Sequence, residues 1–291
     1  MKPAPFEYFA PTSVSEALDK LSELGYSGKV LAGGQSLIPA MNFRMARPSA
    51  LVDLNKVKEL SYIKPTSDGG LAIGTMTRDS LVEENALVNE RFPILVRTLK
   101  HVAHKQIRNR GTFGGAIAHA DPAAQLPAAS LLLDANLKVL SKSGERWVKA
   151  TDFFIGPFMT VLEPEEMLAE VVLPPLAPRT GTSYQQVSRQ KGGYAQAAVI
   201  SAVTLDAADK VKEVRVALFS VGETALLAKK PHEVLAGTVP TAEAIEEVAA
   251  YVAKNECDPG TDIHGTEEYR RNLVHVLVRR SLTEAVQQAK R

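Results

Sequence analysis

Apolar residues near the N-terminus recur at the spacing of an α-helix. They fall every three or four positions between residues 14 and 24, and Ser13 with Glu16 forms the capping-box pattern that starts many helices. Gly25 then supplies a residue that commonly ends a helix. The pattern predicts a helix over residues 14–24 with Ser13 as its N-cap.

Short apolar runs after this helix predict β-strands at residues 29–32, 52–54 and 71–74. The alternation of helix and strand predicts an α/β arrangement for the first part of the chain. A second helical period covers residues 92–105. The small, apolar stretch at 123–133 predicts a buried helix.

A cluster of prolines separates this part from the rest of the chain. Three prolines lie between residues 174 and 178 and Gly181 follows, so we place the domain boundary here. The later pattern predicts an α+β domain whose last helix carries Arg279 and Arg280 where cations suit the helix dipole. Its predicted elements are strands at 196–205 and 211–221, a turn at 206–210, and helices that start after Thr241 and after Thr266.

Composition and charge narrow the classes of function. The 291 residues are 45% hydrophobic and 23% charged, which suits a globular protein with apolar cores. The formal net charge of +1 gives no electrostatic reason to expect nucleic acid or an anionic membrane as the main partner. The one cysteine, Cys257, excludes an internal disulfide framework and an all-cysteine metal or iron–sulfur site. No apolar run resembles a signal peptide or is long enough to span a membrane, so we expect a cytoplasmic protein.

The first candidate for ligand chemistry is a glycine pair that directly follows a predicted strand. Gly33 and Gly34 allow the main chain to approach a ligand closely and to adopt positive φ angles. Consecutive backbone N–H groups can then converge on a pyrophosphate, with the Ser36 hydroxyl beside them. A plain turn is the alternative interpretation of this segment by itself.

A second glycine-rich segment, residues 110–115, lies about 80 residues further along the chain. Thr112 can donate a hydrogen bond to a phosphate, and Lys105, Arg108 and Arg110 place positive charge on the approach to it. A basic surface turn is the alternative for this segment alone. Together the two segments predict a bipartite clamp for a dinucleotide.

The sequence does not support other common kinds of nucleotide, metal or catalytic site. No Gly-x-Gly-x-x-Gly opens a helix and no glycine frame precedes Lys-Ser/Thr, which argues against a Rossmann-type NAD site and a nucleotide triphosphatase. His101 and His104 share a face of the predicted second helix, but no acidic or cysteine ligand accompanies them, so no metal site is expected. His119 and Asp121 lack an accompanying nucleophile motif, so we expect them to form loop hydrogen bonds.

Four parts of the chain match segments of a known family, namely residues 32–39 with 44–54, residues 101–122, residues 189–195 and residues 262–271. The run 101–122 is long enough to be highly specific. Together they resemble the FAD-binding medium subunits of molybdenum hydroxylases, a family that includes carbon monoxide dehydrogenase, quinoline oxidoreductase and xanthine dehydrogenase flavoproteins. The resemblance implies an α+β fold: a two-lobed PCMH-type FAD-binding domain, then a C-terminal domain with a small antiparallel sheet and helices. The implied domains are residues 1–176, with lobes of about 1–57 and 58–176, and residues 177–291.

The same resemblance implies a role for each matching position. The two glycine segments hold the FAD pyrophosphate from opposite sides, while Leu168 and Tyr194 lie by the isoalloxazine ring. Gln35, Gln125 and Gln185 differ from the residues of many relatives, which affects the tuning of the flavin and leaves FAD binding intact. The implied FAD contacts are Ala32, Gly33, Gly34, Gln35, Ser36, Leu37, His101, Ile107, Gly111, Thr112, Gly114, Gly115, Ala116, Asp121, Gln125, Leu168, Gln185 and Tyr194.

The implied function is that of an oxidoreductase subunit with no catalytic residue of its own. A large molybdopterin subunit oxidises the substrate, a small subunit with two [2Fe–2S] clusters conducts the electrons, and FAD on this chain passes them to an external acceptor. FAD is the only cofactor expected on this chain. The complex is expected to be a dimer of heterotrimers. Two alternatives stay open: a self-sufficient FAD-dependent oxidase or reductase of the same superfamily, and an assembly subunit that has lost FAD.

Overall fold

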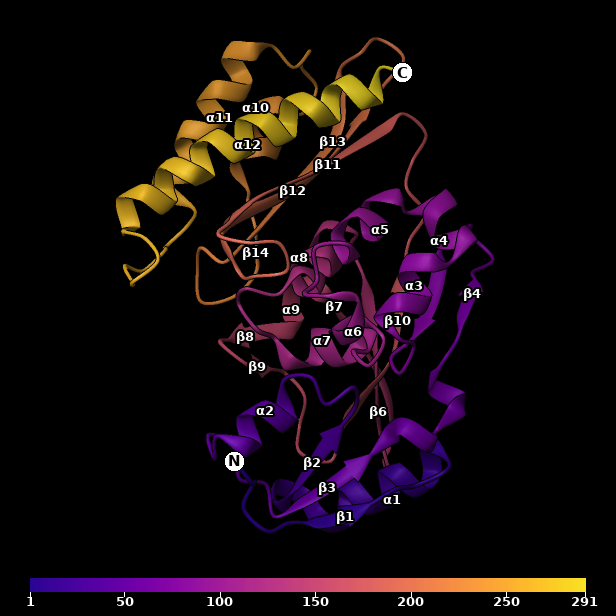
Figure 1. Ribbon diagram of the computed structural model, residues 1–291. Helices are drawn as coiled ribbons and strands as arrows, with labels where there is room; N and C mark the ends of the chain where they lie inside the picture. The colour runs from indigo at the N-terminus through magenta and orange to yellow at the C-terminus, as the bar shows by residue number, and fades with distance from the viewer.

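The computed structural model describes all residues, 1–291, as two lobes and a C-terminal domain that follow one another from bottom to top of Figure 1. The first lobe contains β1 (Glu7–Phe9), α1 (Val14–Leu24), β2 (Gly28–Leu31), α2 (Leu37–Asn42) and β3 (Ala50–Asp53). Its three strands form a parallel sheet in the order β1-β3-β2. The first glycine segment therefore leaves the carboxyl end of an edge strand and runs into α2.

The second lobe is built on a five-stranded antiparallel sheet in the order β4-β5-β10-β6-β7, and α7 packs on it next to β5 and β10. A small hairpin of β8 and β9 lies outside this sheet. The elements are β4 (Ile63–Pro65), β5 (Leu71–Gly74), α3 (Asp79–Glu84), α4 (Ala86–Arg91), α5 (Pro93–Leu99), α6 (Lys105–Arg108), α7 (Phe113–His119), α8 (Gln125–Leu132), β6 (Asn136–Ser141), β7 (Gly144–Lys149), α9 (Ala150–Phe153), β8 (Phe154–Gly156), β9 (Met159–Thr160) and β10 (Met167–Leu173).

The C-terminal domain is an antiparallel sheet whose four strands pair in sequence order. Its elements are β11 (Thr180–Ser188), β12 (Ala195–Leu205), β13 (Val211–Phe219), β14 (Leu226–Leu227), α10 (Lys230–Leu235), α11 (Ala242–Asn255) and α12 (Glu267–Ala289). Every residue of β12 is buried, because helices cover both faces of the sheet. Alternate residues of a strand point to opposite faces, so β12 contributes to two cores.

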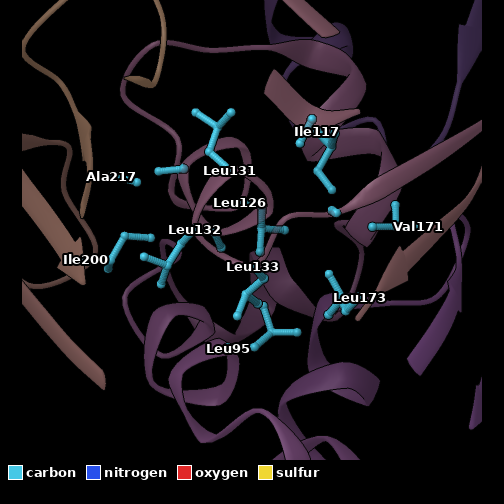
Figure 2. Packing of buried hydrophobic residues seen from close by; sticks show 14 of the residues in the cluster. Leu95, Ile117, Leu126, Leu131, Leu132, Leu133, Val171, Leu173, Ile200 and Ala217 are labelled. Atoms are coloured by element: carbon cyan, nitrogen blue, oxygen red, sulfur yellow. The ribbon is translucent and has the colours of Figure 1, made fainter. Parts of the chain in front are cut away.

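One of these cores is shared between the second lobe and the C-terminal domain. Ile200 and Ala217 of the C-terminal sheet pack with Leu131 and Leu132 of α8 (Figure 2). On the opposite face, Val199 belongs to a separate core with α11 and α12. The C-terminal domain is thus joined to the second lobe by buried apolar surface.

The predicted helix starts and strands are confirmed. The Ser13 hydroxyl accepts from Glu16 N at 3.2 Å, and Thr241 and Thr266 cap α11 and α12 in the same way. The Glu16 carboxylate accepts from Thr12 N at 2.8 Å, so the capping box is shifted by one residue. Strands β2, β3, β5, β12 and β13 and the buried helix α8 lie within two residues of the predicted limits.

The predicted second helix was too long. It ends at Leu99 and not at residue 105, and a turn then leads into α6. The Arg108 guanidinium donates to Val102 O at 2.9 Å, which diverts that carbonyl from the ladder of a continued helix. His101 and His104 therefore lie outside any helix and share no helix face.

Three further expectations about helices were wrong. Residues 113–115, expected to belong to a glycine-rich loop, form the start of α7 with Thr112 as N-cap. His119, expected to form loop hydrogen bonds, is the last residue of α7, and its ring packs on that of Phe158 with centroids 5.1 Å apart. Arg279 and Arg280 lie in the middle of α12, which continues to Ala289, so they do not stabilise its C-terminal end.

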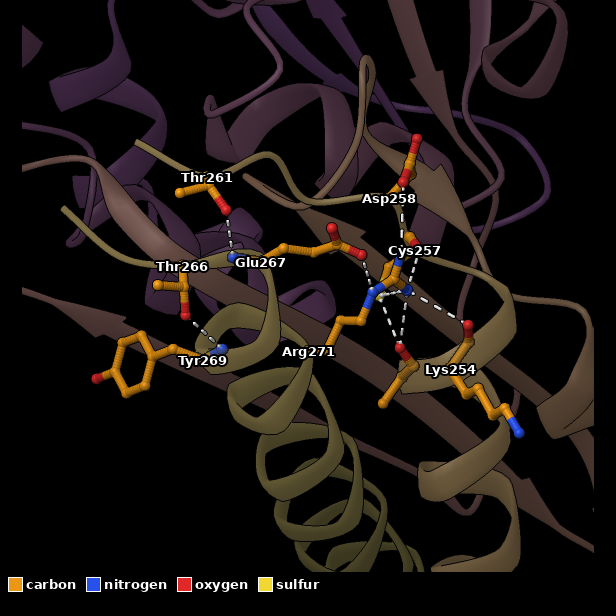
Figure 3. A network of polar contacts seen from close by, with 9 residues as sticks. Lys254, Cys257, Asp258, Thr261, Thr266, Glu267, Tyr269 and Arg271 are labelled. Carbon is orange, nitrogen blue, oxygen red and sulfur yellow. Dashed lines mark hydrogen bonds and ion pairs between the residues drawn. The ribbon is translucent and has the colours of Figure 1, made fainter. Parts of the chain in front are cut away.

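The start of α12 is fixed to the end of α11 by one arginine. Figure 3 shows Arg271 donating to the Cys257 carbonyl at 2.7 Å and pairing with Glu267 at 2.7 Å. The Cys257 thiol is buried and donates to Ala253 O at 3.3 Å, and burial raises its pKa. Cys257 is therefore a packed residue near a helix end.

Candidate functional site

The two glycine segments lie in direct contact. A Cβ atom on Gly33 would lie 2.8 Å from Gly111 Cα and would overlap the Arg110 carbonyl oxygen. A Cβ on Gly115 would lie 3.1 Å from that of Ala32. Only glycine at position 33 allows the two backbones to meet this closely, so the predicted pairing of the segments is a feature of the fold.

The first segment presents a run of free backbone donors. The N–H groups of residues 33–36 donate to no acceptor within the chain. Gly34 has a φ of +74°, and the Gln35 amide donates to Gly33 O at 3.1 Å, which holds the turn in shape. Ser36 is exposed, and its hydroxyl makes no capping bond to α2. Successive N–H groups of this kind form a concave anion site, and they fit a pyrophosphate.

The second segment uses most of its donors internally. The N–H groups of Gly114 and Gly115 donate to Thr75 O at 3.0 Å and to the Thr112 hydroxyl at 3.2 Å. Gly111 N–H and Ala116 N–H also have acceptors in the chain, on Ile107 O and Thr112 O. Thr112 keeps a free backbone N–H and a hydroxyl hydrogen. The two segments are therefore unequal: the first supplies the row of amides, and the second supplies Thr112.

A loop after β5, which the sequence did not mark, supports the second segment along its length. Thr75 O, Thr77 O and Asp79 N bond its backbone at 3.0 Å, 3.0 Å and 3.1 Å. A Cβ on Gly114 would lie 2.7 Å from Thr75 Cα, so this glycine is required for packing against the loop. Burial raises the pKa of Asp79 to about 7, against the lowering effect of the cation at Arg108. No motif identifies these residues, because the backbone makes most of the contacts.

The expected cluster of cations is reduced to one residue. Lys105 pairs with Glu84 at 3.0 Å, and Arg108 pairs with Glu83 at 2.7 Å. Arg110 has no carboxylate within ion-pair distance. The expectation that all three cations attract an anion was wrong for Lys105 and Arg108, whose charges are already balanced.

His101, one of the predicted FAD contacts, lies at the junction with the C-terminal domain. Its ring stacks on that of Tyr184 with centroids 4.4 Å apart and an interplanar angle of 15°. The buried Gln125 amide donates to His101 O at 3.1 Å. Desolvation, followed by the positive charge of Lys191, lowers the pKa of His101.

The neighbouring position in β11, Gln185, faces the other way. Its amide donates to Glu284 of α12 at 2.8 Å and does not reach His101 or Gln125. Leu168 is buried in the core, and its carbonyl accepts from the Thr75 hydroxyl at 2.9 Å. Leu168 therefore contacts Thr75, which supports the second glycine segment, whereas Gln185 bonds α12 instead.

Tyr194 connects the C-terminal domain to the turn between α7 and α8. The residue is 71% exposed, while its hydroxyl donates to Asp121 Oδ2 at 3.0 Å. The other Asp121 oxygen accepts from Ala123 N at 2.8 Å, so Asp121 forms loop hydrogen bonds as predicted. Partial burial of the hydroxyl, together with the Asp121 carboxylate, raises the pKa of Tyr194 to about 12.

No group of three or more histidine, cysteine, aspartate or glutamate side chains is placed to hold a metal ion. Among the helices, none combines the length and the apolar character that crossing a membrane requires. The glycines, the free amides of residues 33–36 and Thr112 have an arrangement that fits an organic phosphate.

Comparison with known proteins identifies the family. Residues 4–176 match the FAD binding domain in molybdopterin dehydrogenase, and residues 182–285 match the CO dehydrogenase flavoprotein C-terminal domain. The chain is 38% identical to 6-hydroxypseudooxynicotine dehydrogenase complex subunit alpha of Paenarthrobacter nicotinovorans, over 100% of this chain and 97% of that relative.

Solved structures agree over the full length. Carbon monoxide dehydrogenase from Hydrogenophaga pseudoflava matches with a TM-score of 0.95 at 36% identity, covering 99% of both chains. Quinoline 2-oxidoreductase from Pseudomonas putida 86 matches with a TM-score of 0.93 at 34% identity, covering 100% of both chains. The chain therefore belongs to the family of FAD-binding medium subunits of molybdenum hydroxylases, and the resemblance seen in its sequence is confirmed.

Proposed function

We propose that this subunit holds FAD non-covalently, with the pyrophosphate on the free N–H groups of residues 33–36 and with Thr112 opposite them. The observation that carries the proposal is this run of unpartnered amides beside a backbone contact that only glycine allows. His101, Gln125 and Tyr194 would then lie on the isoalloxazine side. Bound FAD supplies the redox chemistry, and the protein sets its position and surroundings.

We further propose that residues 1–176 form the FAD-binding domain, with lobes of about 1–57 and 58–176, and that residues 177–291 complete it from the flavin side. The Tyr194–Asp121 hydrogen bond and the stacking of His101 on Tyr184 support this arrangement. Both contacts join the C-terminal domain to residues 101–121 of the FAD-binding domain. The remaining predicted FAD contacts are proposed unchanged, with Gln185 the weakest since it bonds α12.

The place of the subunit in its complex is also a proposal. The relative from Paenarthrobacter is named as one subunit of a dehydrogenase complex. We infer that a large molybdopterin subunit oxidises the substrate, that a small subunit with two [2Fe–2S] clusters delivers the electrons, and that this chain passes them to an external acceptor. The assembly would be a cytoplasmic dimer of heterotrimers. The single cysteine of this chain supports the location of the clusters on a partner.

The isolated subunit tests this assignment against both alternatives. We expect the purified chain to be yellow, and we expect anaerobic addition of an aldehyde or an N-heterocycle to leave its flavin absorbance unchanged. Addition of the partner subunits should allow the complex's own substrate to bleach the flavin. Bleaching without partners would instead identify a self-sufficient oxidase, and a colourless chain after incubation with FAD would identify an assembly subunit.

A charge at position 125 should change the flavin potential in a pH-dependent way. A carboxylate in Gln125→Glu would oppose the negative charge gained on reduction, by about 1 kcal/mol after screening, which corresponds to about 20 mV for a two-electron couple. The site is buried and faces the His101 carbonyl, so the pKa of the introduced acid should be raised. Spectroelectrochemical titration should therefore show a lowered midpoint potential at pH 9 and little change at pH 6, relative to the wild type at each pH.

The variant Gln125→Met is the matched control, because it removes the amide and adds no charge. Its potential should differ from that of the wild type by the same amount at both pH values. A Gln125→Glu potential that is unchanged or raised at pH 9 would mean that position 125 is not near the isoalloxazine ring.

A further inference from the structure

Two polar side chains connect the glycine segments to each other. Asn55 Nδ2 donates to Ala32 O, at the start of the first segment, at 2.9 Å. Arg78 Nη2 donates to Asn55 Oδ1 at 2.6 Å, and Arg78 Nη1 donates to Arg110 O at the start of the second segment. The result is a continuous bridge from one segment to the other, anchored on a main-chain carbonyl at each end.

Both members of the bridge are fixed by the fold. Asn55 follows β3, and its N–H donates to the capping carboxylate of Asp53 at 2.9 Å. Arg78 is the N-cap residue of α3 and pairs with Thr112 as an isolated β-bridge. The bridge therefore joins the first lobe to the second at the point where the two glycine backbones touch.

The charge of Arg78 has no carboxylate partner within ion-pair distance. Desolvation and the nearby cation of Arg110 lower its pKa, while the carboxylates of Asp53 and Asp79 act in the opposite direction. Holding two guanidinium groups close together costs electrostatic free energy. The Arg78 guanidinium donates to Arg110 O, the same carbonyl that a Cβ on Gly33 would overlap, so its charge lies beside the row of free amides, where a bound pyrophosphate would offset that cost.

We propose that Arg78, acting through Asn55, is the positioning residue that sets the spacing of the two glycine segments for FAD. This inference rests on the proposed function. An arginine suits the task because its planar guanidinium donates to two acceptors at once in a fixed geometry, which a lysine ammonium cannot reproduce. The bridge leaves the backbone N–H groups of residues 33–36 free, so it shapes the site without occupying it.

The FAD dissociation constant of the full-length apoprotein, measured by flavin fluorescence quenching, tests the bridge. A hydrogen bond from a charged group contributes more free energy than a neutral one, so its loss in Arg78→Gln should weaken FAD binding by about 30-fold. Arg110→Gln removes the same charge but keeps the Arg110 carbonyl that accepts from the bridge, so we expect a loss of at most about fivefold. Arg78→Lys keeps the charge and should still bind FAD about tenfold more weakly.

A double-mutant cycle distinguishes positioning from a general loss of structure. Asn55→Ala alone should weaken binding about tenfold, and adding it to Arg78→Gln should produce almost no further loss, since either change breaks the same bridge. The urea midpoint of each apoprotein should stay close to that of the wild type.

Three results would overturn the inference: equal losses in Arg78→Gln and Arg110→Gln, additive losses in the double variant, or losses that follow the urea midpoints. The Asn55→Ala arm keeps the test decisive if the arginine variant does not fold. Failure of the wild-type protein to bind FAD would instead refute the proposed function.

Discussion

Replacing Gly33 by valine is expected to reduce FAD content below about a tenth of the wild-type value while the protein stays folded. The new side chain would overlap the Arg110 carbonyl and would come within van der Waals radii of Gly111 Cα, at 2.8 Å from its Cβ. Both of these atoms belong to backbone, which cannot rotate away as a side chain can. The two segments must therefore separate, and the pyrophosphate loses its contact with one of them.

The measurement is the flavin absorbance per mole of protein after purification and after incubation with excess FAD. Gly260→Val is the matched control, since no atom lies within 4 Å of a Cβ at that position. Circular dichroism on both variants reports whether the fold is retained. Normal FAD content in a folded Gly33→Val protein would remove residues 33–36 from the binding site.

Gly114 is a poorer probe of the same site. Its missing Cβ faces Thr75, with a distance of 2.7 Å to Thr75 Cα, and its N–H already donates to Thr75 O. A valine there would displace the supporting loop, so loss of FAD would follow from local unfolding. The two glycines look equivalent in the sequence, and only the packing shows that Gly33 lies between the two segments whereas Gly114 lies against the supporting loop.

Local patterns predicted most elements of the fold because their causes are local. Ser13, Thr241 and Thr266 each place a hydroxyl where the first amides of a helix need an acceptor, and each caps a helix in the structure. β12 was recognisable because a strand buried on both faces is largely apolar, as β12 is apart from Gln196, Ser201 and Thr204. The end of α5 was not, because it depends on Arg108 reaching Val102 O from the next helix.

The candidate site was predictable only where a residue type itself carries the chemistry. Gly33 and Thr112 were found because glycine pairs and hydroxyls are expected at a phosphate. Arg78 and Asn55 were missed, since neither belongs to a recognisable motif and each acts only after the segments that follow β3 and β5 are brought together. Tyr184 was missed in favour of Gln185, although a shift of one residue in a strand moves a side chain to the opposite face.

Truncating Phe219 is expected to destabilise the FAD-binding domain as well as the C-terminal domain to which it belongs. Phe219 is fully buried on the sheet face that packs against α8, with its ring centroid 6.3 Å from that of Tyr184. Phe219→Ala should lower the free energy of unfolding by about 3–5 kcal/mol, through lost burial and the cavity that remains. Because the core is shared across the domain boundary, we expect the cost to appear in the unfolding of both domains.

The single tryptophan makes this coupling measurable. Trp147 lies in β7, within the five-stranded sheet of the FAD-binding domain and outside the shared core, so its fluorescence reports that domain alone. In a urea titration of the apoprotein, Phe219→Ala should move the Trp147 transition and the far-ultraviolet circular dichroism transition to the same lower midpoint. The exposed Phe158 provides a control of the same residue type, and Phe158→Ala should leave both midpoints nearly unchanged.

A Trp147 transition that stays at the wild-type midpoint in Phe219→Ala would show that the domains unfold independently. The buried contact between α8 and the C-terminal sheet would then contribute little to the FAD-binding domain.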